Sequence, residues 1–68
     1  MTSRFTVDAR GKKAYLGSKV LYENNIWILE DIEYLLWSNE QYLTLKNIKN
    51  KNKTVNFISP NNIIAVKE

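Results

Sequence analysis

Short stretches in which apolar and polar residues alternate run through this chain, and they predict β-strands separated by turns. Residues 41–46 alternate with a period of two, so we expect Leu43 and Leu45 to face the same side of a strand. A second alternating stretch predicts that Val55 and Phe57 share one face. Together, the alternation and the β-forming side chains predict strands at residues 19–23, 26–37, 41–46, 54–59 and 63–66.

The segment 26–37 is apolar on both faces, which a single regular strand does not explain. A long bent strand with a bulge near Glu30 and Asp31 accounts for this pattern, because one extra residue reverses the faces. A helix across 26–43 is the alternative, since its apolar residues also fit a helical stripe. The β-branched and aromatic content of the segment favours the strand.

Turn signals separate these strands. Asp8 to Gly11 reads as a tight turn, Asn24 and Asn25 read as a hairpin loop, and Pro60 ends the fourth predicted strand. The chain has 68 residues, which is enough for a single domain covering 1–68. Five strands at intervals of about 8–12 residues predict a small all-β sandwich or barrel.

Two stretches carry a resemblance to a known architecture. The end of the chain, Ile58-Ser59-Pro60-Asn61-Asn62-Ile63-Ile64, and the run Val20-Leu21-Tyr22-Glu23-Asn24 are similar to segments of the Src-homology-3-like small barrel. The resemblance covers residues 16–66 and is nearer to the compact Tudor and KOW branches. It implies a five-stranded barrel with one helical turn before the last strand. Those branches bind RNA, DNA, modified peptides or other proteins, so the fold leaves the ligand open.

The chain departs from the polyproline-binding members of that architecture. Their long loop after the first strand and their adjacent Trp pair are both missing here. The resemblance therefore does not imply a proline-rich ligand.

The composition removes several classes of chemistry. The chain has no Cys and no His, so it has no disulfides, no Cys or His metal ligands, no thiol nucleophile and no imidazole base. We therefore expect a non-enzymatic binding module with no cofactor, no metal and no small-molecule substrate. No apolar run approaches the roughly 18 residues that span a bilayer, and the N-terminus lacks a signal-peptide pattern. A cytoplasmic protein without a membrane partner is the resulting expectation.

The net charge of +3 hides a division of the chain into three blocks. Residues 1–22 hold five basic residues against one acidic residue, and residues 46–68 hold the same numbers. Residues 23–45 hold five acidic residues and no basic one. If the two basic blocks lie together in the fold, they form a positive patch that the net charge understates.

The tract 46–53 holds four lysines and three asparagines in eight residues and is the main candidate for binding the phosphates of DNA or RNA. A solvated hairpin tip that does not bind would have the same composition. We expect Trp27 in the core and Trp37 at the surface, where an accessible ring could stack on a base. Residues 1–13 are expected to form a loosely ordered basic arm. The candidate nucleic-acid-binding residues are Lys12, Lys13, Lys46, Lys49, Lys51, Lys53, Trp37 and Tyr42.

The acidic block supports an alternative function. Glu30, Asp31 and Glu33 would lie on a solvated strand face that could pair with a basic partner protein. In that case the chain is a protein-interaction module, such as an accessory subunit or an inhibitor from a phage or mobile element, and it uses its acidic face or a strand edge.

Overall fold

Antiparallel strands make up nearly all of the regular structure in this computed structural model, which describes residues 4–34, 40–50 and 52–66. The all-β class predicted from the sequence is confirmed. None of the described residues belongs to a helix long and apolar enough to cross a membrane. The elements in chain order are β1 (Phe5–Val7), β2 (Lys13–Tyr15), β3 (Lys19–Tyr22), β4 (Asn25–Tyr34), β5 (Gln41–Asn47), β6 (Thr54–Ile58), the 3-10 turn η1 (Pro60–Asn62) and β7 (Ile64–Ala65).

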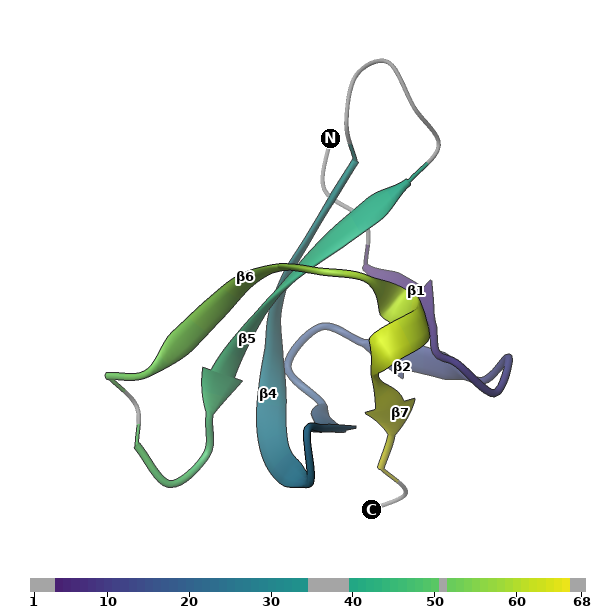
Figure 1. The fold of residues 1–68 in the computed structure, drawn as a ribbon. Coiled ribbons are helices and arrows are strands. Elements are labelled where there is room, and N and C mark those ends of the chain that lie inside the picture. The colour runs from purple at the N-terminus through teal and green to yellow at the C-terminus, as the bar shows by residue number, and fades with distance from the viewer. Residues whose placement is uncertain (1–3, 35–39, 51, 67–68) are drawn as a thin grey trace.

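The strands form two sheets. β3 to β7 make a curved five-stranded sheet in the order β6-β5-β4-β3-β7, whereas β1 and β2 form a separate hairpin beside η1 and β7 (Figure 1). The helical alternative for 26–43 is wrong for the described part of that range, which lies in β4 and β5. The helical turn expected before the last strand is present as η1. β6 and β7 lie at opposite ends of the strand order, and no described pairing joins them.

A bulge in β4 explains why its sequence is apolar on both faces. The register with β5 shifts between Leu29 and Asp31, as predicted, and leaves Glu30 exposed and outside the pairing. Leu29 and Ile32 are three positions apart, yet both are completely buried. The extra residue therefore keeps two halves of one strand in contact with the same core.

A two-residue turn joins β3 to β4. Tyr22 pairs with Asn25, so Glu23 and Asn24 occupy the loop, with φ angles of 48° and 64°. Two successive positive φ angles are the signature of a type I′ hairpin turn, whose twist matches that of the strands. The predicted loop of Asn24 and Asn25 was wrong by one residue, because Asn25 already belongs to the ladder.

β6 departs from its predicted alternation. Leu43 and Leu45 of β5, two residues apart, pair with Ile58 and Val55 of β6, which are three residues apart. The prediction that Val55 and Phe57 share a face is wrong: Val55 packs against the core, whereas the side chain of Phe57 is 76% exposed. The φ of Phe57 is +59°, a left-handed conformation that costs about 1–3 kcal/mol for a bulky residue.

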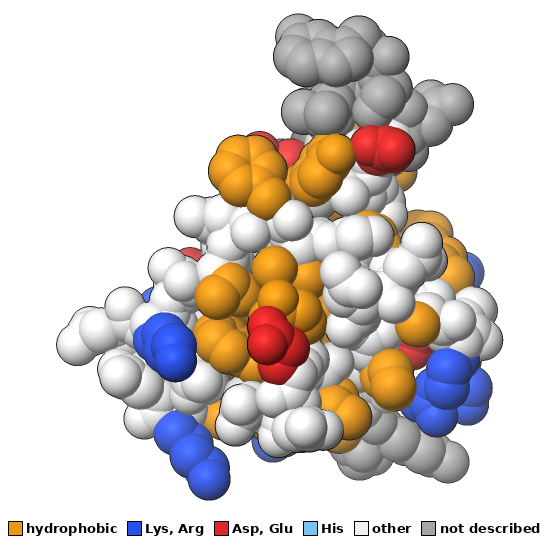
Figure 2. All heavy atoms as spheres, in the orientation of Figure 1, with side chains coloured by type: hydrophobic (Ala, Val, Ile, Leu, Met, Phe, Trp, Pro, Cys, Tyr) orange, Lys and Arg blue, Asp and Glu red, His pale blue; other side chains and the backbone are white. Residues whose placement is uncertain are grey.

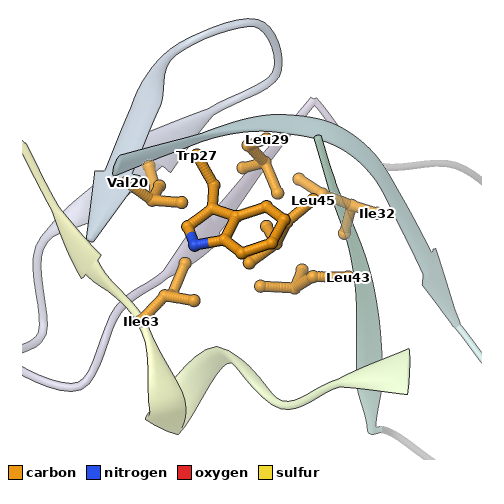
Figure 3. Close-up of a cluster of buried hydrophobic side chains, with 8 residues drawn as sticks. Val20, Trp27, Leu29, Ile32, Leu43, Leu45 and Ile63 are labelled. Atoms are coloured by element: carbon orange, nitrogen blue, oxygen red, sulfur yellow. The ribbon is translucent and has the colours of Figure 1, made fainter. Parts of the chain in front are cut away.

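The core lies on the concave side of the sheet. Trp27, which was expected there, occupies the middle of the cluster (Figure 3), and its indole N–H donates to the carbonyl oxygen of Tyr22 at 3.0 Å. Ile63 closes the cluster from the segment between η1 and β7. The buried hydrophobic residues are Ala14, Val20, Trp27, Leu29, Ile32, Leu43, Leu45 and Ile63.

Residues 4–13, the described part of the expected loosely ordered arm, are built into the fold. In β1, Thr6 is buried, and Asp8 directly after the strand is 3% exposed. The Asp8 carboxylate accepts backbone N–H groups from Arg10 at 2.9 Å, Lys12 at 2.8 Å and Ala65 at 2.7 Å. One side chain therefore closes the predicted turn and ties it to β7.

Candidate nucleic-acid interface

The face of the sheet that points away from the core, here called the outer face, is basic at one end. Lys19 pairs with Ile28, and Ile28 pairs with Lys46, so the three form one row across β3, β4 and β5. All three are half-buried, and each alternates along its strand with a buried residue. The aliphatic stems of the two lysines can therefore cover apolar surface while their ammonium groups stay in water.

A groove of about 400 Å³ lies next to this row. The β3–β4 turn, the β5–β6 connection and the end of the chain after β7 meet there, along the lower edge of the molecule in Figure 1. None of the described residues that line it is acidic. We call it the basic groove; its lining residues are Lys19, Asn24, Asn25, Ile26, Asn47, Ile48, Lys49 and Val66.

Asparagines give the β5–β6 connection its shape. Asn47 Oδ1 accepts the backbone N–H groups of Lys49 at 2.9 Å and Asn50 at 3.0 Å, and Asn50 Oδ1 accepts that of Asn52 at 3.2 Å. Such side-chain turns hold a loop without a sheet ladder. The lysine side chains take no part in these bonds, and Lys49 and Lys53 are exposed. Lys51 lies outside the described residues.

Lys12 and Lys13 lie on the β1–β2 hairpin, outside the basic groove. The ammonium of Lys13 is 4.9 Å from the centre of the Phe5 ring. The centres of the Phe5 and Tyr15 rings are 5.9 Å apart across the hairpin. The side chain of Tyr15 is 53% exposed. The Phe5 ring beside Lys13 was missed from the sequence, because only the pairing of β1 with β2 brings these two residues together.

Tyr42, by contrast, is not beside the lysines of the tract. It is separated from Lys46 by four positions of extended strand, about 13 Å. Tyr42 pairs with Glu33 of the neighbouring strand β4, and its hydroxyl donates to Glu40 Oε2 at 2.9 Å. The hydrogen bond to Glu40, the negative charge of that carboxylate and desolvation raise the pKa of Tyr42. The other predicted stacking residue, Trp37, lies outside the described residues.

The three acidic candidates lie in the second half of β4, whereas its first two residues line the basic groove. Asp31 pairs with Thr44 and Glu33 with Tyr42, which places both carboxylates on the outer face, whereas Glu30 is the bulged residue. No group of three or more potential ligands converges on a metal position in the part of the chain that the structure describes. The outer face is therefore basic at one end and acidic at the other.

A larger hollow of about 640 Å³ lies where β1 and η1 approach the ends of β4 and β5. The Thr6 hydroxyl donates to Gln41 Oε1, and Gln41 Nε2 donates to the Tyr34 hydroxyl at 2.8 Å. These groups satisfy one another and connect β1 to the sheet. Because these lining groups are already paired with one another, we assign the hollow no ligand.

The surface shows this division of charge only in part. Figure 2 shows hydrophobic side chains in the middle of one face with an acidic side chain among them, Lys and Arg at its lower left and lower right, and further acidic side chains near the top. The charge blocks of the sequence are therefore only partly separated, since Glu23 of the acidic block lies in the β3–β4 turn next to the basic groove. Comparison of the chain with known protein families, with curated proteins and with solved structures finds no match.

Proposed function

We propose that the chain is a non-enzymatic nucleic-acid-binding module of the small Src-homology-3-like barrel type. The observation that carries the proposal is the basic groove, in which Lys19 and Lys49 flank a hollow of about 400 Å³ without a described acidic residue in its lining. The strand order β6-β5-β4-β3-β7 and the turn η1 before β7 support the barrel type.

The chemistry of the basic groove suits a sugar-phosphate backbone. Lysine ammonium groups neutralise phosphates and release counterions, which is the main sequence-independent source of affinity for nucleic acids. Side-chain amides, here those of Asn24 and Asn25, can bond to phosphate or sugar oxygens. Ile26, which also lines the groove, offers an apolar surface to a sugar or base. The module would therefore hold its ligand chiefly through the backbone.

Salt dependence tests this proposal directly. We expect the affinity for single- and double-stranded oligonucleotides, measured by fluorescence anisotropy, to fall steeply between about 50 and 200 mM salt. Lys49→Gln and Lys19→Gln should each lower the slope of log K against log salt by about 0.7 for a single strand and 0.9 for a duplex. Arg4→Gln removes the same charge from an exposed position outside the basic groove and serves as the matched control.

Two outcomes would contradict the proposal. If the lysine variants keep the original slope, the basic groove does not contact phosphates. If Arg4→Gln weakens binding as much as Lys49→Gln does, the net charge of the chain, and not the basic groove, is responsible for the affinity.

A protein-interaction module is the second candidate. The observation that favours it is the position of Asp31 and Glu33 on the outer face, with Glu30 exposed at the adjacent bulge. Reversing these three charges should abolish capture of a basic partner protein while leaving oligonucleotide binding intact. Recovery of the same partner with the triple variant would exclude this acidic face as the contact.

A further inference from the structure

Phe57 lies in the stretch of β6 where the register with β5 shifts, which calls for an extra residue but not for a large apolar one. Its side chain is 76% exposed, and its φ of +59° lies in the left-handed region that bulky residues avoid. Its described ring contact is with Tyr42, edge-on at 6.0 Å between the ring centres. Burial does not account for a large apolar side chain held here at a cost in backbone energy. Strained positions of this kind are concentrated at binding sites.

The surroundings of Phe57 are acidic. A hollow of about 230 Å³ on the outer face is lined by Glu33, Tyr42, Thr44, Asn56 and Phe57. The hydroxyl of Tyr42 is held by Glu40, which brings a second carboxylate to the Tyr42 ring. None of the described lining residues is basic. The hollow therefore combines two aromatic rings with negative charge.

We propose that Phe57, Tyr42 and Glu33 form a binding site for an arginine side chain presented by a partner protein. The negatively charged faces of aromatic rings attract a cation, and a carboxylate beside them pairs with it. Arginine fits better than lysine, because its planar guanidinium can stack on a ring and bond to a carboxylate at the same time. A nucleic acid does not suit this site, since Glu33 and Glu40 repel phosphate. The site goes beyond the proposed function, and it does not depend on the basic groove.

A short synthetic peptide of alternating arginine and serine is the probe. We expect it to shift the amide resonances of Glu33, Tyr42 and Phe57 in an NMR titration of the whole chain. The same peptide with citrulline in place of arginine keeps the shape and loses the charge, so it should not bind. A lysine version should bind more weakly, by a few-fold.

Phe57→Gly separates a binding role from a structural one. Glycine adopts positive φ without strain, so this variant should be at least as resistant to urea as the parent chain. It should nevertheless bind the arginine peptide about tenfold more weakly, through loss of the cation–π contact. Phe57→Leu keeps an apolar side chain without a π face and should lose affinity to a similar extent.

Three results would overturn the proposal. The first is full affinity of the Phe57→Gly and Phe57→Leu variants for the arginine peptide. The second is equal binding of the citrulline peptide. The third is a single-stranded oligonucleotide that shifts the resonance of Phe57 while the arginine peptide does not, which would make this surface part of a nucleic-acid interface. The proposed function would still stand if the arginine peptide failed to bind while Lys19→Gln and Lys49→Gln lowered the slope of oligonucleotide affinity against salt.

Discussion

Asp8 accepts a hydrogen bond from the backbone N–H of Ala65, 57 positions further along the chain, with an Oδ2···N distance of 2.7 Å. Its other carboxylate oxygen accepts the N–H groups of Arg10 and Lys12. A nearly buried carboxylate thus joins the first turn of the chain to its last strand. Bonds from three backbone donors to a charged acceptor are among the stronger hydrogen bonds in proteins.

Replacing Asp8 with Asn should destabilise the fold at neutral pH. An amide presents an NH₂ group where one carboxylate oxygen now accepts, so at least one buried backbone N–H loses its partner. Leaving such a group unsatisfied costs about 1–3 kcal/mol in the free energy of unfolding. Urea denaturation followed by circular dichroism measures this loss. Asp31→Asn is the control, because Asp31 Oδ1 accepts the N–H of the next residue, Ile32, and no bond to a distant strand is described for it; it should change stability far less.

The contribution of Asp8 should vanish in acid. Burial raises the pKa of Asp8, but the backbone hydrogen bonds from Ala65, Lys12 and Arg10 and the charge of Arg10 outweigh it, so the pKa falls below its ordinary 3.8. A carboxylate whose pKa is lower in the folded state stabilises the fold above its unfolded pKa, and this contribution is lost as the pH falls through the folded pKa. The stability difference between parent and Asp8→Asn should therefore shrink below about pH 4. A difference that stays constant into strong acid would contradict this assignment.

The β3–β4 turn lies one residue earlier than the sequence indicated, and this position can be tested by substitution. Asn24 has a φ of 64°, so Asn24→Val should destabilise the fold by about 1–2 kcal/mol, whereas Asn24→Gly should be tolerated. Asn25 lies in β4, so Asn25→Val should cost much less, because valine suits a strand. Thermal unfolding of the three variants measures these effects. An equal loss of stability in Asn24→Val and Asn25→Val would show that the two-residue loop is not formed by Glu23 and Asn24.

Ile63 should matter to stability as much as the core residues of the sheet do. It is completely buried although it lies in the short segment between η1 and β7. Ile63→Ala should lower the free energy of unfolding by about 2–5 kcal/mol, because the vacated space is enclosed. Ile48→Ala, at a side chain that is 37% exposed, is the matched control and should cost much less. Urea denaturation distinguishes the two variants.

If a single strand extends from the basic groove to the β1–β2 hairpin, Tyr15 should contribute to its binding more than Tyr42 does. Tyr15 is 53% exposed near the lysine-bearing face of the hairpin, whereas Tyr42 lies between Glu33 and Glu40. Base stacking on an aromatic ring is worth about 1–3 kcal/mol, so Tyr15→Ser should weaken single-strand binding at least several-fold. Tyr42→Ser should have little effect in the same anisotropy measurement. The reverse order would show that the ligand lies along the acidic end of the sheet.

Much of the fold could be predicted from local pattern. The bulge near Glu30 followed from apolar residues on both faces of one strand, and the core position of Trp27 followed from its apolar neighbours. These features depend on residues close together in the chain. The first hairpin was missed because its two strands are only three residues each and their inward-facing residues are Thr6 and Ala14, which give little hydrophobic signal.

The candidate site was predicted less completely. The binding role of a charged or aromatic residue depends on its neighbours in space, which the sequence does not show. The lysines of the tract were expected to work with Tyr42, yet strand pairing places that ring beside Glu33 and brings Lys19 to the groove instead. The sequence also did not show that Asn47 and Asn50 close the loop of the tract through their Oδ1 atoms.

By itself, the sequence determined the approximate positions of the strands of the five-stranded sheet, most of the turns and how charge is divided along the chain, since each of these depends on a few adjacent side chains and their backbone preferences. Only the tertiary structure decided that Asp8 reaches Ala65, that Phe57 faces solvent and that Tyr42 joins the acidic residues. Those relationships depend on hydrogen-bond register between strands, and one inserted residue reverses every face that follows it.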